Sequence, residues 1–133
     1  MIDKKNYAKG LKNRKKVLGA KYVNNTLKNR NNFNNDFQEF ITDYCWHKVW
    51  DKKYLSNKQK SFNNLCMLAC TNKWPEFKLH LKGAINNGCN LHELKELFLQ
   101  IAVYCGVPTG VECFKHAEDF FKSADIDITE VMS

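Results

Sequence analysis

Helix-breaking residues are rare in this chain, and most of them fall where a helix is expected to begin or end. Only two prolines and six glycines occur among 133 residues, and apolar residues recur mostly every three or four positions. The sequence therefore predicts an all-α fold of six to seven helices in a single domain over 1–133, with its core at 33–123. The ranges expected to be helical are 4–18, 23–30, 36–50, 56–69, 74–88, 90–105 and 111–121.

Length and composition support one globular domain. Apolar residues make up 44% of the 133 positions, which is enough to build a hydrophobic core. The chain is long enough for one domain and too short for two. No run approaches the 18 or so apolar residues of a membrane span, and the charged N-terminus lacks a signal-peptide core. We expect a cytoplasmic protein with no membrane partner.

The chain is basic, with a net charge of +7. Lysine and arginine clusters are typical of nucleic-acid binding, but the positive charge is densest only over 9–16 and is mixed with acidic residues elsewhere. No zinc-finger, RNA-recognition or glycine-rich phosphate-binding pattern is present. We therefore expect no nucleic-acid partner. The positive charge indicates an attraction for small anions, and a simpler explanation is that it keeps the protein soluble. A basic oligomeric binding module is the alternative to an enzymatic function.

The six cysteines are expected to be free thiols. Cys66, Cys70 and Cys105 fall in apolar helical runs, where a thiol behaves as a small hydrophobic group, and a reducing compartment disfavours disulfides. No CxxC pair occurs, and Cys113 with His116 forms a lone CxxH without a second half. The sequence therefore predicts no metal site.

An aromatic segment over 36–50 is expected to contribute to the core. Its apolar residues lie close to one helical stripe, which is more often core than binding pocket. Trp46 and Trp50 add a pair four positions apart. The residues of the stripe are Phe37, Phe40, Ile41, Tyr44 and Val49.

A carboxylate and an imidazole four residues apart are the most specific chemical feature. Glu76 and His80 lie on one face of the helix predicted from Trp74 to Gly88, in which Pro75 suits the first turn and Gly88 suits the end. A Glu that orients and charges a His is a common proton-transfer arrangement near neutral pH. The alternative is an ordinary half-exposed pair that stabilises the helix slightly.

The order of these segments resembles the carboxymuconolactone decarboxylase/alkylhydroperoxidase D superfamily, in its decarboxylase branch, over nearly the whole chain. Each motif is weak alone, but their order and spacing together are specific. The residues that carry the resemblance are Gly10–Gly19, Asp36–Tyr44, Trp46, Trp50, Leu68, Glu76, His80, Ala84, Asn86–Gly88, Glu93, Glu96, Gln100 and Tyr104–Pro108.

The resemblance implies an all-α homotrimer or homohexamer whose Glu/His helix lines the pocket. It also implies cofactor-free conversion of 4-carboxymuconolactone, a small anionic lactone, to 3-oxoadipate enol-lactone and carbon dioxide in protocatechuate breakdown. On this hypothesis His80 donates the proton, and Glu76 orients it and keeps it charged. Arg14 binds a substrate carboxylate, while Trp46 and Tyr104 form an apolar wall.

Two positions depart from the decarboxylase pattern, which usually carries Gly after the tryptophan and Arg before a Ser-Leu pair, where this chain has Ser61-Phe62. His47 and Lys60 stand there, and either could alter the substrate-binding site. In the peroxidase branch two cysteines precede the histidine, but Lys73 and Glu76 occupy those positions, which argues against disulfide chemistry at this site. Two alternatives stay open. One is a relative that acts on another small lactone or carboxylic acid, and the other is a thiol-dependent, alkylhydroperoxidase-like antioxidant protein that uses Cys66, Cys70 or Cys105.

Overall fold

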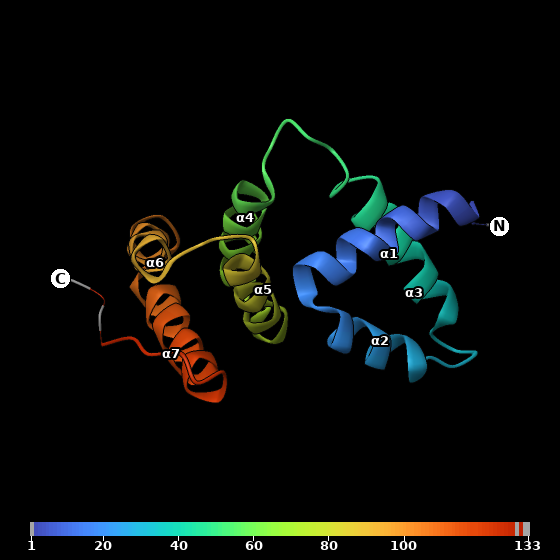
Figure 1. The fold of residues 1–133 in the computed structure, drawn as a ribbon. Helices are drawn as coiled ribbons and strands as arrows, with labels where there is room; N and C mark the ends of the chain where they lie inside the picture. The colour runs from blue at the N-terminus through green and yellow to red at the C-terminus, as the bar shows by residue number, and fades with distance from the viewer. Residues whose placement is uncertain (1, 130, 132–133) are drawn as a thin grey trace. The chain divides into compact units, whose positions relative to one another are not determined.

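The computed structural model describes residues 2–129 and 131, and within them the fold is all-helical (Figure 1). Seven α-helices and one π-helical turn are present among these residues, and no strand is found there. The prediction of an all-α fold of six to seven helices is therefore confirmed. The elements are α1 (Lys4–Leu18), α2 (Ala20–Lys28), α3 (Asn35–Ile41), η1 (Thr42–His47), α4 (Asn57–Cys70), α5 (Trp74–Asn86), α6 (Leu91–Cys105) and α7 (Val107–Ser123).

The helices form two compact units. Unit 1 ends at Asn57 and contains α1, α2, α3 and η1, and unit 2 begins at Lys58 and contains nearly all of α4 and the whole of α5, α6 and α7. The single domain over 1–133 with a core at 33–123 stays a prediction. In the described part of the chain, no helix combines the length and the apolar character needed to cross a membrane.

Local sequence signals set the ends of several helices. The side chain of Asn90 accepts from the backbone N–H of Glu93, while the Glu93 side chain accepts from the backbone N–H of Asn90, so α6 begins with a complete capping box. Gly88 and Gly106 have φ values of 93° and 104°, which L side chains rarely adopt, and they follow α5 and α6. One boundary differs from expectation: Pro108 lies in the first turn of α7 rather than in a preceding turn, because that position needs no backbone N–H.

Unit 1 is built on close contact between α1 and η1. Gly10 faces the backbone of Thr42, and a Cβ atom added there would lie 2.1 Å from the Thr42 carbonyl oxygen. Trp46 and Trp50 are buried and their rings stack with centroids 5.1 Å apart. The Asn13 amide donates to the Trp46 carbonyl oxygen. A residue without a side chain thus allows α1 to approach η1.

The expected aromatic core stripe is wrong for four of its five residues. The buried face of this segment is the one toward α1, and Trp46 and Trp50 occupy it. The predicted stripe lies on a different face, which is exposed within the described structure. Phe40 and Tyr44 stack on each other with ring centroids 5.3 Å apart. Helical periodicity identifies an apolar face, but it does not identify what covers that face. The exposed members are Phe37, Phe40, Tyr44 and Val49.

Unit 2 has its own hydrophobic core, to which each of its four helices contributes. Phe77 and Phe98 are its largest fully buried side chains, and their ring centroids lie 5.8 Å apart. The core residues of the four helices are Leu65 and Ala69 of α4, Phe77, Leu81 and Ala84 of α5, Leu94, Phe98 and Ile101 of α6, and Cys113, Ala117 and Phe121 of α7.

The prediction of six free thiols is wrong for two of them. Cys70 and Cys105 form a disulfide that joins the last residue of α4 to the last residue of α6. Both residues are exposed rather than buried in an apolar run. The two cysteines are separated by 35 positions in the sequence, and nothing in the spacing indicated that the two helix ends meet. Cys45, Cys66, Cys89 and Cys113 are free thiols, as expected.

Gly10→Ala should destabilise unit 1, because the new methyl group would overlap the Thr42 carbonyl and force α1 away from η1. We expect a loss of about 1–3 kcal/mol or more in the free energy of unfolding, measured by denaturant titration. Lys12→Ala, at an exposed position of the same helix, is the control and should leave stability nearly unchanged. Equal stability of the two variants would contradict the close contact.

Reduction of the Cys70–Cys105 disulfide should lower the free energy of unfolding by about 3–4 kcal/mol, because the bond restricts a 35-residue loop in the unfolded chain. The measurement is denaturant unfolding with and without a reducing agent. Cys70→Ala should lose this dependence on the reductant, whereas Cys45→Ala, which removes a free thiol of unit 1, should retain it. Parent protein that is insensitive to reduction would argue against the bond.

Candidate functional site

His80 lies at the edge of the unit 2 core. Helix α5 buries Phe77, Leu81 and Ala84, and the neighbouring face carries His80, which is half-buried, and Glu76, which is exposed. Pro75 lies in the first turn of this helix, as the sequence predicts. The four-residue spacing puts the carboxylate one turn before the imidazole, on the solvent side.

The burial of His80 opposes the charge predicted for it. Burial lowers the pKa of His80 to about 4, and the opposing effect of the Glu76 carboxylate, which raises the pKa, is smaller. The free-energy cost of burying an imidazolium exceeds the stabilisation that an exposed carboxylate gives it. His80 is therefore neutral at pH 7, and its neutral form has one ring nitrogen that donates and one that accepts.

The face of α4 that meets α5 carries polar side chains. The Asn64 amide nitrogen lies 3.4 Å from Nδ1 of His80. The Asn87 amide donates to Oγ of buried Ser61 over 2.9 Å. Lys60 is also buried, with 8% of its surface exposed, and it lies one helical turn before Asn64. The structure thus places a buried ammonium group on the helix that contacts the imidazole.

Arg14, a predicted substrate ligand, is buried in unit 1. Its Nη1 donates to Oγ1 of Thr42 over 3.2 Å and its Nη2 donates to Oε1 of Gln38 over 3.0 Å. Burial lowers the pKa of Arg14. These bonds tie α1 to η1 and α3, so the guanidinium has a structural role. Its contact with a substrate carboxylate stays a prediction.

The other two candidates of unit 1 lie on η1. Trp46 is buried against Trp50, in agreement with its interpretation as a core residue. Nδ1 of His47 lies 3.2 Å from the Asp43 carboxylate, one turn earlier on the same element. The side chain of His47 is mostly buried, with 17% exposed. Their substrate roles are not tested by this geometry.

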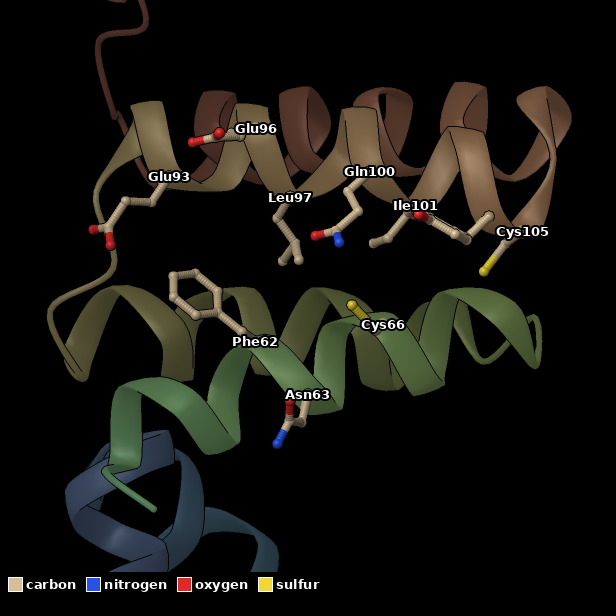
Figure 2. Close-up of a pocket in the computed structure, with 10 residues that line it drawn as sticks. Phe62, Asn63, Cys66, Glu93, Glu96, Leu97, Gln100, Ile101 and Cys105 are labelled. Atoms are coloured by element: carbon tan, nitrogen blue, oxygen red, sulfur yellow. The ribbon is translucent and has the colours of Figure 1, made fainter.

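Tyr104 lies apart from the core and lines a cavity between α4 and α6. Its side chain is exposed. Figure 2 shows this cavity. The cavity has a volume of about 560 Å³, and neither Glu76 nor His80 is among its lining residues. The lining is Phe62, Asn63, Cys66, Glu93, Glu96, Leu97, Gln100, Ile101, Tyr104 and Cys105.

The cavity carries negative charge. Glu93 pairs with Lys58 over 2.7 Å, and the hydrogen bonds from Lys58 and from the Asn90 backbone lower the pKa of Glu93. Glu96 adds a second carboxyl group to the lining. An anionic substrate is disfavoured by such a lining. The α4–α5 face with Lys60 and His80 is the better site for an anion.

Sequence reasoning missed Asn64 as a member of the site. The signal was present, because Asn63 and Asn64 stand in the middle of a helix, where asparagine is a poor helix former. Of the two, Asn63 lines the cavity and Asn64 meets His80. Among residues 2–129 and 131, no group of three or more metal-ligating side chains is found.

Comparison with known proteins identifies the family. The model of the carboxymuconolactone decarboxylase family matches residues 35–119. The chain belongs to this family. It is 38% identical over 126 residues to the 4-carboxymuconolactone decarboxylase of Acinetobacter baylyi, covering 95% of this chain and 94% of that protein. It is 42% identical over 106 residues to the nitrosuccinic acid decarboxylase npaB of Metarhizium robertsii, covering 80% of this chain and 74% of that protein.

These matches confirm the family resemblance and the enzyme class. Both relatives are decarboxylases by name, so the predicted carboxy-lyase class of this carboxymuconolactone decarboxylase family member is confirmed. Their names also imply a small carboxylic acid as the substrate. The two names differ in that acid, so relatives within the family act on different substrates.

The low pKa of His80 predicts a specific loss of stability in acid. The folded protein holds His80 neutral down to about pH 4, whereas the unfolded chain protonates it near pH 6.5. Stability contributed by the neutral imidazole is therefore present above pH 6.5 and is lost as the pH falls toward 4. Unfolding measured across this window should show less acid destabilisation in His80→Gln than in the parent.

A matched control separates His80 from carboxylates that titrate in the same range. His92→Gln changes an exposed histidine of α6 and should keep the parent pH dependence. Identical pH dependence of His80→Gln and the parent, or an NMR titration of His80 centred near 6.5, would contradict a buried neutral imidazole.

Proposed function

We propose that the protein catalyses the cofactor-free decarboxylation of 4-carboxymuconolactone to 3-oxoadipate enol-lactone and carbon dioxide. The observation that carries the proposal is His80, a half-buried imidazole between α5 and the face of α4 that bears Lys60. The 38% identity to a 4-carboxymuconolactone decarboxylase over 95% of the chain supports the choice of substrate. The proposal includes a late place in protocatechuate breakdown, a cytoplasmic location and a homotrimer or homohexamer.

The substrate itself can hold the electrons of the broken bond. Its departing carboxylate is conjugated through the ring double bond to the lactone carbonyl. Loss of carbon dioxide therefore leaves a dienolate, which becomes the product when the ring carbon next to the carbonyl takes up a proton. The protein needs a cation for the substrate carboxylates, a donor for the developing oxyanion and an acid near that carbon.

The residues of unit 2 can supply two of these three groups. Lys60 is the cation that binds a substrate carboxylate, and its burial strengthens that attraction. His80 is the acid. Its imidazole is neutral before substrate binds, and the negative charges of bound substrate raise its pKa toward the working pH. Glu76 orients the imidazole from the exposed side.

The remaining residues enter the proposal through the family resemblance. The resemblance assigns further polar contacts with the substrate to Arg14 and His47 and exclusion of water to Trp46 and Tyr104, although Tyr104 lines the cavity between α4 and α6 rather than the α4–α5 face. A drier site favours loss of a charged carboxylate.

A second substrate class shares the same chemistry. The relative named nitrosuccinic acid decarboxylase is 42% identical over 80% of this chain. In nitrosuccinic acid the nitro group is bonded to the carbon that bears one carboxylate, so its N=O bond stands β to that carboxylate and can accept the electrons released with carbon dioxide as a nitronate, as the lactone carbonyl does. Both acids carry a second carboxylate for a lysine to bind. The alternative is therefore a decarboxylase of a small diacid with a conjugated or β electron acceptor.

The Cys70–Cys105 disulfide is the observation that keeps thiol chemistry open as a second function. Peroxide reduction by this pair would oxidise the dithiol to the disulfide with release of water, and it would need a thiol reductant to restore the pair. This activity would be lost in Cys70→Ala and kept in His80→Ala. Decarboxylation should show the opposite pattern.

We expect release of carbon dioxide from 4-carboxymuconolactone by the purified protein without added cofactor or thiol. His80→Ala should lower kcat on the order of 10²- to 10⁴-fold, because the acid is removed. Lys60→Met should mainly raise KM, by roughly 10- to 100-fold, because a charge-assisted contact is lost. Glu76→Gln should lower kcat less than His80→Ala.

His92→Ala is the control, since it removes an exposed histidine of α6, and it should keep the parent rate. The same enzymes are then assayed with nitrosuccinic acid. Turnover of nitrosuccinic acid but not of 4-carboxymuconolactone would support the alternative substrate class. A folded His80→Ala variant with the parent rate on both acids would refute the role of His80.

A further inference from the structure

The Cys70–Cys105 disulfide lies at the corner between α4 and α5. Cys70 is the last residue of α4, and residues 71–73 form the whole connection to α5. Within this connection Asn72 has a φ of 57°, and its backbone N–H donates to the carbonyl oxygen of Ala69. The bond joins this tight corner to the last residue of α6. The position of the corner relative to α6 is therefore fixed covalently.

The same corner presents the Glu76 carboxylate. Glu76 lies in the first turn of α5, and the backbone N–H of the next residue, Phe77, donates to the carbonyl oxygen of Lys73 in the connection. His80 lies one turn later, beside Leu81, which is fully buried in the core. The Glu76 carboxylate acts on the His80 imidazole electrostatically. A shift of the corner therefore changes the place of the carboxylate more than that of the ring.

Both cysteines are exposed, so they are accessible to thiols from solution. A dithiol attacks one sulfur of the bond as its thiolate and forms a mixed disulfide, and its second thiol then displaces the protein sulfur. Two electrons and two protons pass to the protein, which gains two thiols, while the reductant becomes a disulfide. Exposed disulfides are the labile ones. In the cytoplasm, the proposed location, disulfides are usually transient and catalytic or redox-sensing.

We propose that the Cys70–Cys105 pair is a redox switch of the proposed decarboxylase site, more active as the disulfide than as the dithiol. The inference rests on the proposed function, in which Glu76 orients His80. In the disulfide form, α6 holds the corner between α4 and α5, and Glu76 keeps its place beside the imidazole. In the dithiol form the corner loses its covalent anchor, and Glu76 spends less time where it orients the ring.

Noncovalent anchors limit the size of the effect. The Trp74 ring, at the start of α5, stacks on the His116 ring of α7 with centroids 4.9 Å apart. It also meets the ring of buried Phe77 edge-on. These contacts do not depend on the disulfide, so α5 stays folded after reduction. Because the switch acts through Glu76, reduction should lower kcat by no more than Glu76→Gln does.

The kinetic test measures decarboxylation of 4-carboxymuconolactone in buffers with different ratios of oxidised to reduced dithiothreitol. As the pair is reduced, kcat of the parent should fall roughly 3- to 10-fold with little change in KM, because the carboxylate is displaced while Lys60 at the other end of α4 is not. Cys70→Ala should show the reduced rate at every ratio. Cys45→Ala, which removes a free thiol of unit 1, should respond as the parent does.

Glu76→Gln separates a switch that acts through the carboxylate from a general loosening of the fold. This variant should lose no further activity on reduction, because the group that the switch displaces is already gone. A parent whose kcat does not follow the redox state would overturn the switch and leave the proposed function standing. A Glu76→Gln variant that responds as strongly as the parent would also overturn it.

The indole N–H signals in NMR spectra report the corner independently of activity. Reduction should shift the signal of Trp74, which is assigned by its loss in Trp74→Phe. The signals of Trp46 and Trp50, which belong to unit 1, should stay in place. An unchanged Trp74 signal in the fully reduced parent would overturn the switch. A parent whose Trp74 signal shifts on reduction but which decarboxylates neither acid would refute the proposed function.

Discussion

The packing of α4 against α5 is the interaction on which the candidate site depends. It removes much of the His80 imidazole from water, places Asn64 against Nδ1 and buries Lys60 one turn away. Burial also explains why the imidazole is neutral despite a carboxylate on the same helix face. Proton donation then depends on a substrate that brings its own negative charge. In the proposed function, substrate binding raises the pKa of the ring, which is neutral without substrate.

Electrostatics separate two regions of unit 2. The cavity between α4 and α6 carries Glu93 and Glu96, and Cys105 of the Cys70–Cys105 disulfide is part of its lining. The α4–α5 face carries Lys60 instead. A small diacid is attracted to the second region and repelled by the first. The cavity between α4 and α6 is therefore not the place where the decarboxylation chemistry is expected.

Sequence patterns predict features that depend on neighbours along the chain, and they fail for features that depend on distant segments. Gly88 and the Asn90 capping box mark helix ends because caps are local. The four-residue spacing identified the His80 pair for the same reason. The meeting of Cys70 with Cys105, the exposure of the aromatic stripe and the contact of Asn64 all require the packing of separate helices. The charge of His80 required its burial, which spacing does not give.

Decarboxylation of 4-carboxymuconolactone in heavy water tests the central claim most directly, because it follows the proton that His80 is proposed to deliver. Our account predicts one deuterium on the ring carbon next to the lactone carbonyl, placed on a single face, and loss of both rate and facial selectivity in His80→Ala. Deuterium distributed equally over both faces by the parent enzyme would mean that solvent protonates a released dienolate, and would contradict the account.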